Sequence, residues 1–172
     1  MQTDNSESSD ETEISAVALR RKSEQGDAYA LLTLQQMARE GDAEAQFELG
    51  FLYACSWEIS PVSRDYHEAA KWWHMAAEEG HAASQYNLSV AYARGYGVDR
   101  NMTESVKWVR KAAENGDADA QWRLGYSYAC GNDGLPKDLI EAGKWLQKAA
   151  DQGEGNAINY LRNLKKQSND PS

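Results

Sequence analysis

Small and apolar residues recur along this chain at a fixed spacing between polar positions. The segments AREGDAEAQFELGFLYA, AEEGHAASQYNLSVAYA and AENGDADAQWRLGYSYA align without gaps, and each precedes a second similar block that contains a tryptophan. From glycine to glycine the period is 36 to 39 residues, which predicts three repeats of one structural unit. The shared columns are Gly41, Gly80 and Gly116; Leu49, Leu88 and Leu124; Tyr53, Tyr92 and Tyr128; and Trp72, Trp108 and Trp145.

Each repeat carries the start and stop signals of two helices. The shared glycines are typical of a helix end, where glycine adopts a left-handed conformation, and Asp42 or Asp117 directly afterwards can cap the next helix. The second helix is predicted to begin at a capping residue followed three positions later by glutamate, the spacing of a capping box. These pairs are Asp65 and Glu68, Asn101 and Glu104, and Asp138 and Glu141. The predicted fold class is all-α.

The repeats set the expected domain organisation. Residues 14–40 are predicted to form an amino-terminal cap of two helices, over 14–25 and 27–40, followed by repeats at about 41–79, 80–115 and 116–152. A terminal helix over 154–167 would cover the last core face. Residues 1–13 carry five acidic and no basic side chains, so we expect this tail and residues 168–172 to be disordered.

The pattern GDAxAQxxLGxxY, then GxGV, then AxxW followed by KAA, resembles the Sel-like repeat, a relative of the tetratricopeptide repeat. The resemblance covers roughly residues 38–153, although the first copy lacks the loop glycines and Ser89 replaces a glycine in the second. It implies an α-solenoid, a right-handed superhelix of antiparallel helix pairs. It also implies a protein that acts as an adaptor or scaffold, often in bacteria.

Charge and hydropathy exclude several classes of partner. The 172 residues include 18 basic and 27 acidic side chains, and the formal charge of −9 repels phosphate backbones, so we expect no nucleic acid partner. No apolar stretch approaches the roughly 20 residues that a membrane span needs. The first residues lack the basic start and apolar run of a signal peptide, which predicts a cytoplasmic protein.

Columns shared by all copies are explained by stacking of the repeats, so we predict that the shared leucines and tryptophans form the core. If the first helix of each repeat lines the concave face, as in tetratricopeptide-like solenoids, one stripe of variable residues points into a groove. That stripe suits an apolar or helical peptide because aromatic side chains dominate binding hot spots, but the same rings could simply fill the inner face. The predicted partner-binding residues are Glu44, Phe47, Phe51, Tyr86, Val90, Arg94, Asp119, Trp122 and Tyr126, with Cys55 and Cys130 on the same stripe.

Trp57 lies in an inserted loop outside the repeat pattern. Its position fits either a contact at the rim of the groove or an anchor for the loop.

The sequence gives little support for a catalytic site or a metal site. His67, His74 and His81 are seven residues apart, so neighbours on a helix would be about 10 Å apart along its axis, too far for one ion bound at roughly 2 Å. Cys55 and Cys130 occupy the same position two repeats apart, a separation of at least ~16 Å for helices packed at 8–10 Å and beyond the ~7 Å that a disulfide permits. Free thiols are therefore expected. No phosphate loop, nucleophile elbow or His-Glu-x-x-His pair is present.

The leading function is thus a non-enzymatic interaction module for a protein or peptide, without a cofactor or a metal. Two alternatives remain. One is a small-molecule binder or hydrolase related to the cysteine-rich branch of the family, and the other is a homodimer through the concave face.

Overall fold

The computed structural model describes residues 15–55 and 62–168, and all regular secondary structure in these ranges is helical. The all-α prediction is confirmed. The predicted disordered tail 1–13, the residues after Ser168 and the loop residue Trp57 lie outside the described residues. The helices are α1 (Ala16–Glu24), α2 (Ala28–Arg39), α3 (Ala43–Ala54), α4 (Tyr66–Glu78), α5 (Ala82–Arg94), α6 (Met102–Glu114), α7 (Ala118–Cys130), α8 (Leu139–Asp151) and α9 (Gly155–Ser168).

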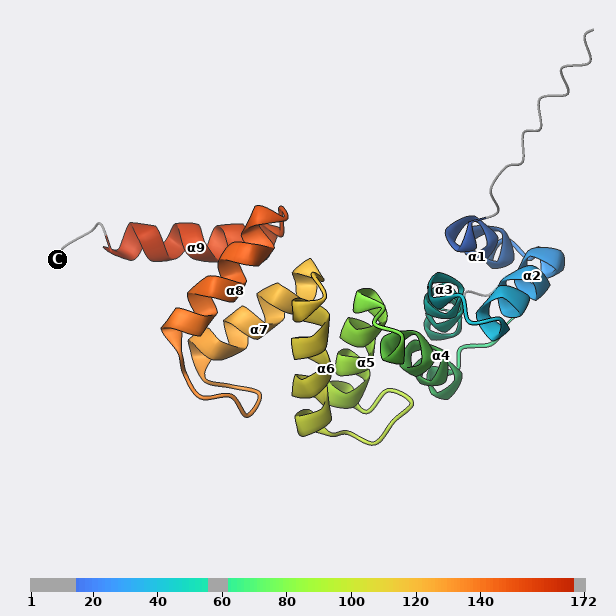
Figure 1. The fold of residues 1–172 in the computed structure, drawn as a ribbon, viewed down its shortest axis with the longest axis horizontal. Helices are drawn as coiled ribbons and strands as arrows, with labels where there is room; N and C mark the ends of the chain where they lie inside the picture. The colour runs from blue at the N-terminus through green and yellow to red at the C-terminus, as the bar shows by residue number, and fades with distance from the viewer. Residues whose placement is uncertain (1–14, 56–61, 169–172) are drawn as a thin grey trace, which may run out of the picture.

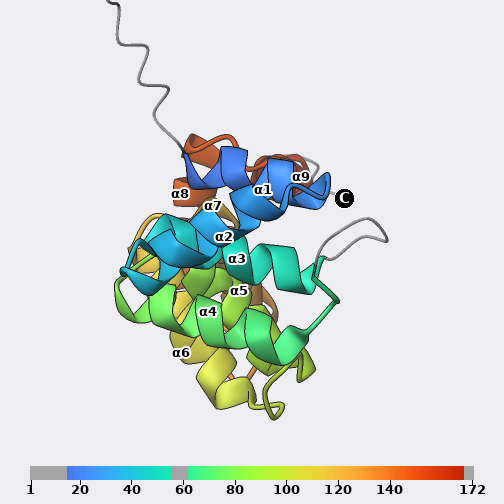
Figure 2. The same cartoon turned by 90° about the vertical axis from the view of Figure 1, so that its right-hand side faces the viewer.

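The helices follow one another along an arch whose two ends, α1 and α9, rise on the same side (Figure 1). Helices pair within each repeat, α3 with α4, α5 with α6 and α7 with α8, and each pair contacts the next. Helix α1 also packs on α3. Seen from the side, α3 and α5 lie nearer the inner side of the arch than α4 and α6 (Figure 2). The first helix of each of the first two repeats therefore faces inward.

The turn that opens each repeat has the predicted form. Gly41, Gly80 and Gly116 adopt positive φ angles of 97°, 90° and 94°, a region that favours glycine. The Asp42 carboxylate accepts the Ala45 N–H at 2.8 Å, and Asp117 does the same in the third repeat. In the second repeat His81 replaces the aspartate, and its Nδ1 accepts the Ser84 N–H at 3.2 Å.

The predicted capping box forms only in part. The three capping side chains accept backbone N–H groups from the first turn of the second helix, as expected. The glutamates do not return the bond, because each instead pairs with a lysine three residues later at 2.5 Å. The backbone N–H of the capping residue donates to the shared tyrosine's carbonyl: Asp65 to Tyr53 at 3.0 Å, Asn101 to Tyr92 at 2.9 Å and Asp138 to Tyr128 at 2.9 Å. These bonds close the loop between the two helices of each repeat.

The shared leucines Leu49, Leu88 and Leu124 are fully buried, and Trp108 and Trp145 are buried as predicted. Trp72 differs, since it is only half-buried at the edge of the core of the first repeat. The next residue, Trp73, is buried, like Val109 and Leu146 at the same position in the later repeats. The large ring fits because Gly50 opposite has no side chain: a Cβ at Gly50 would lie 2.6 Å from the Trp73 ring.

Candidate partner-binding surface

The nine residues predicted to bind a partner lie on α3, α5 and α7, the first helices of the three repeats. None is fully buried. The exposed members are Glu44, Arg94, Asp119 and Tyr126, and the half-buried members are Phe47, Phe51, Tyr86, Val90 and Trp122. Their contacts change in character from one end of the stripe to the other.

At the amino-terminal end the chain covers its own aromatic residues. The Arg20 guanidinium of α1 lies over the Phe51 ring, 4.9 Å from its centroid, and also donates to the carboxylates of Glu48 and Glu24. Sequence reasoning missed Arg20, because Glu48 and Phe51 are 28 and 31 residues away and only the docking of α1 brings them together. Phe51 is thus a contact for α1 rather than an open anchor.

The next part of the stripe is closed by His81. Its ring lies 5.0 Å from the Phe47 ring, and its Nε2 lies 3.1 Å from a Glu44 carboxylate oxygen. His81 therefore links the first turn of α5 to α3 of the preceding repeat. Phe47 also packs on Ala69 and Trp73, so two predicted members of the stripe take part in internal packing.

Two groups in this region, the buried Glu48 and the half-buried Cys55, have raised pKa values. Burial raises the pKa of the Glu48 carboxyl, and the nearby Arg20 charge only partly opposes this. Burial likewise raises the pKa of the Cys55 thiol. A raised thiol pKa reduces the fraction of reactive thiolate, so Cys55 is poorly suited to act as a nucleophile.

The middle of the stripe, on α5, faces the third repeat. Tyr86 packs on the core cluster of that repeat, and burial, followed by the nearby Asp119 charge, raises the pKa of its hydroxyl. Val90 lines a small cavity between the second and third repeats, with room for about one water molecule. Arg94, at the end of α5, is exposed. Of these three, Arg94 is the residue most open to a partner.

At the carboxy-terminal end three aromatic rings lie together, and we refer to Trp122, Tyr126 and Tyr160 as the aromatic cluster. The Trp122 and Tyr126 rings are 5.2 Å apart, and Tyr160 of α9 meets both edge-on at 5.9 and 6.0 Å. Tyr126 is 38% exposed. Sequence reasoning missed Tyr160, because α9 was read only as a cover for the core.

The two cysteines are free thiols, as predicted. Cys130 is exposed and lies beside Tyr126, whose pKa it raises through a hydrogen bond. In the described ranges, no three His, Cys, Asp or Glu side chains are placed to hold a metal ion. Nor is any helix there long and apolar enough to span a membrane.

Comparison with known sequences decides the family. A sequence model described as the Sel1 repeat matches residues 43–81, 82–117 and 118–154, one match for each repeat. The chain belongs to the Sel1 repeat family. Proteins of this family are generally modules for protein–protein interaction. No curated protein matches the whole sequence significantly.

Solved Sel1 repeat structures support the assignment. A Sel1 repeat protein from Oxalobacter formigenes is 38% identical with a TM-score of 0.69, and the match covers 77% of this chain and 97% of that one. The protein c5321, a protective antigen of uropathogenic Escherichia coli, is 31% identical with a TM-score of 0.70. That match covers 90% of this chain but 37% of the other.

The cysteine-rich protein B of Helicobacter pylori is 18% identical with a TM-score of 0.59, and the match covers 80% of this chain and 96% of that one. This likeness concerns the fold alone.

Proposed function

We propose that this protein binds a peptide segment or a partner's helix on the inner face of its arch, with the aromatic cluster as the main anchor site. The observation that carries the proposal is the grouping of Trp122, Tyr126 and Tyr160 at the carboxy-terminal end of the predicted stripe, with Tyr126 substantially exposed. Tryptophan and tyrosine are the side chains most enriched at binding hot spots. Arg94, exposed at the end of α5, would supply a polar contact in the middle of the stripe.

Charge favours an apolar segment flanked by basic residues. The protein has a formal charge of −9, and the exposed side chains Glu44 and Asp119 lie on the same helices as the aromatic residues. Such a field accelerates the approach of a cationic partner and repels an acidic one. The proposal therefore commits to an amphipathic, basic peptide.

The proposal gives the chain no catalytic role. Cys55 is half-buried with a raised pKa, and Cys130 contacts a tyrosine, which is a poor general base at neutral pH. A homodimer through the inner face uses the same aromatic residues, so it is an outcome that the experiment must separate.

The test is a peptide-display selection on the wild-type protein, followed by calorimetric titration of the selected peptides. The Trp122→Ala, Tyr126→Ala double variant should weaken binding by about tenfold to a hundredfold, because two hot-spot side chains are removed. The matched control is Tyr66→Ala, Tyr96→Ala, which removes two exposed rings stacked at 5.0 Å between α4 and the loop after α5. Its binding should stay within twofold of wild type.

Circular dichroism must first show that both variants fold. Equal peptide affinity of the wild type and the Trp122→Ala, Tyr126→Ala variant would overturn the proposal. A wild-type dimer in sedimentation equilibrium that dissociates in this variant would assign the same surface to self-association instead.

A further inference from the structure

A column of buried glutamines ties each repeat to the helix before it. Gln46, Gln85 and Gln121 are 3–5% exposed. The Nε2 of each donates to a carbonyl at the end of the preceding helix: Gln46 to Ala38, Gln85 to Ala77 and Gln121 to Ala113, at 2.9–3.0 Å. This leaves the side-chain oxygen of each glutamine in need of a donor.

The second and third repeats supply that donor from the end of their own second helix. Asn115 Nδ2 donates to Gln85 Oε1 at 3.0 Å and to the Gly80 carbonyl at 3.3 Å. Gln152 Nε2 donates to Gln121 Oε1 at 2.8 Å and to the Gly116 carbonyl at 2.9 Å. One amide thus satisfies two acceptors in each repeat.

The first repeat breaks this pattern. Glu79 stands where the later repeats have Asn115 and Gln152, and an ionised carboxylate has no N–H to donate. The oxygen Gln46 Oε1 is consequently buried without a hydrogen-bond partner. No hydrogen bond to the Gly41 carbonyl is formed within the described residues either.

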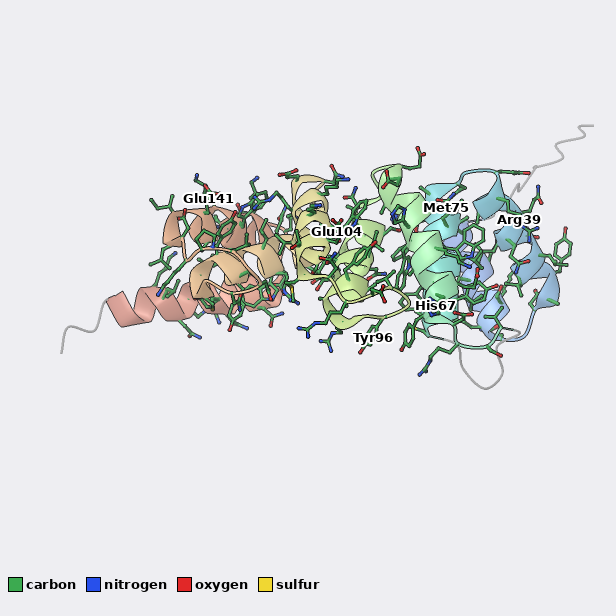
Figure 3. All side chains as sticks on the ribbon, turned by 90° about the horizontal axis from the view of Figure 1, so that it is seen from below. Arg39, His67, Met75, Tyr96, Glu104 and Glu141 are labelled. Atoms are coloured by element: carbon green, nitrogen blue, oxygen red, sulfur yellow. The ribbon has the colours of Figure 1, made fainter. Side chains whose placement is uncertain are left out.

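These unsatisfied acceptors border an open space. Gln46, Gly41 and Glu79 line a cavity of ≈ 540 Å³ together with Arg39, His74, Met75 and Glu78. Figure 3 shows Met75 at one end of α4, with Arg39 of α2 on the neighbouring side. His74 lies beside Glu78, with its Nε2 3.9 Å from a carboxylate oxygen. With this imidazole neutral, one arginine faces two glutamates, and the wall carries a net negative charge that favours one more cation.

We propose that this cavity binds a guanidinium group. Such a group carries five N–H donors in a fixed fork, so it can pair with the Glu79 carboxylate and donate to the Gly41 carbonyl. It reaches the buried Gln46 Oε1 when that side-chain amide turns toward the cavity. Those two acceptors are the ones that an amide satisfies in the later repeats. Met75, 46% exposed, offers apolar contact for a methylene stem. The site is separate from the inner face and independent of its proposed function.

The probe is Nα-acetyl-arginine amide, titrated into ¹⁵N-labelled protein while the Gln46 side-chain amide and the Gly41 and Asp42 backbone amides are followed by NMR. We expect saturable shifts at these groups. The Nα-acetyl-citrulline amide is an uncharged analogue of similar shape and should bind at least tenfold more weakly. A Gly-Gly-Arg-Gly-Gly peptide with blocked ends tests whether the group can come from a protein chain.

Glu79→Gln introduces the residue that the third repeat already has at this position. The new amide should satisfy Gln46 Oε1, weaken the arginine probe at least tenfold and raise the melting temperature. The matched control is Glu114→Gln, which removes the same charge from the exposed position equivalent to Glu78 in the second repeat. The proposal is overturned if Glu79→Gln binds the arginine probe as tightly as wild type. It is also overturned if wild type binds the citrulline analogue, or Nα-acetyl-lysine amide as an ammonium analogue, as tightly as the arginine probe.

Discussion

At the scale of single residues, the ion pair of Glu48 with Arg20 shows burial competing with charge pairing. The Glu48 side chain is 6% exposed. Removing a carboxylate from water costs free energy, and this cost can exceed the attraction of one arginine. Here burial is the larger effect, because the pKa of Glu48 is raised despite the contact with Arg20. The folded protein therefore binds a proton at Glu48 more tightly than the unfolded chain does.

This has a consequence for stability against pH. A folded-state pKa above the ordinary value of 4.5 means that the stabilising effect of protonation is fully present below about pH 4.5 and is lost as the pH rises through the folded-state pKa. Glu48→Gln should remove this pH-dependent loss of stability, because glutamine stays uncharged at every pH. We expect urea unfolding to show the variant gaining stability relative to wild type between pH 4.5 and pH 7.

The control for Glu48→Gln is Glu104→Gln, which alters the solvent-accessible pair with Lys107. Exposed pairs of this kind contribute little, so its stability difference should change little over the same pH range. A Glu48→Gln variant that loses stability relative to wild type as the pH rises would show that the Arg20 pair outweighs burial.

At this scale the sequence predicted correctly those features that depend on contacts between residues close together in the chain. Asp42 and Asp117 cap helices that begin one residue later, and the required spacing is visible in the sequence. Arg20, His81 and Tyr160 were missed as parts of the inner face. Each contacts a ring or carboxylate at least 28 residues away, and those distances depend on how the helices stack.

At the scale of helices, the closeness of each pair is set by one column in the first helix. Gly50, Ser89 and Gly125 occupy it. A Cβ at Gly125 would lie 2.8 Å from Leu146 Cγ and 3.0 Å from the Leu146 backbone nitrogen, so α7 and α8 approach too closely for a side chain. The repeat pattern identified this column, but the sequence did not show that it faces the partner helix.

Gly125→Ala tests this contact against Gly143→Ala. Gly143 lies inside α8 with open space around its Cβ direction, so alanine there should stabilise the helix by about 0.5–1 kcal/mol. Alanine at Gly125 brings the same gain in helix propensity, but it forces α7 and α8 apart, which should cost about 1–3 kcal/mol of stability. Urea unfolding should therefore show Gly143→Ala above wild type and Gly125→Ala below it; equal stabilisation by both would refute the close packing.

At the scale of the whole molecule, stability is distributed along the arch. One buried cluster joins α1, α2 and α3 around Leu34 and Leu49, and a separate one joins α6 to α9 around Leu124 and Leu146. The substantial contacts run between neighbouring helices and from α1 to α3. The repeat sequence predicted this linear architecture, since each copy can bury its apolar residues only against adjacent copies. It could not predict which end keeps its aromatic residues exposed, because that depends on how α1 and α9 dock.

Because the two cores are separate, a destabilising substitution in one core should affect mainly the helices around it. Leu124→Ala empties a fully buried site in the carboxy-terminal cluster and should cost about 3 kcal/mol or more. In a repeat array that loss falls mainly on the neighbouring helices, so hydrogen exchange should accelerate in α6 to α9 while α1 to α3 keep most of their protection. Leu49→Ala, equally buried in the amino-terminal cluster, should give the mirror pattern. If both variants accelerated exchange uniformly across all described helices, the arch would unfold as a single cooperative unit. The helices around the aromatic cluster and around the Gln46 cavity would then have the same free energy of unfolding. If unfolding is local instead, a ligand at either site should slow hydrogen exchange only at its own end of the chain.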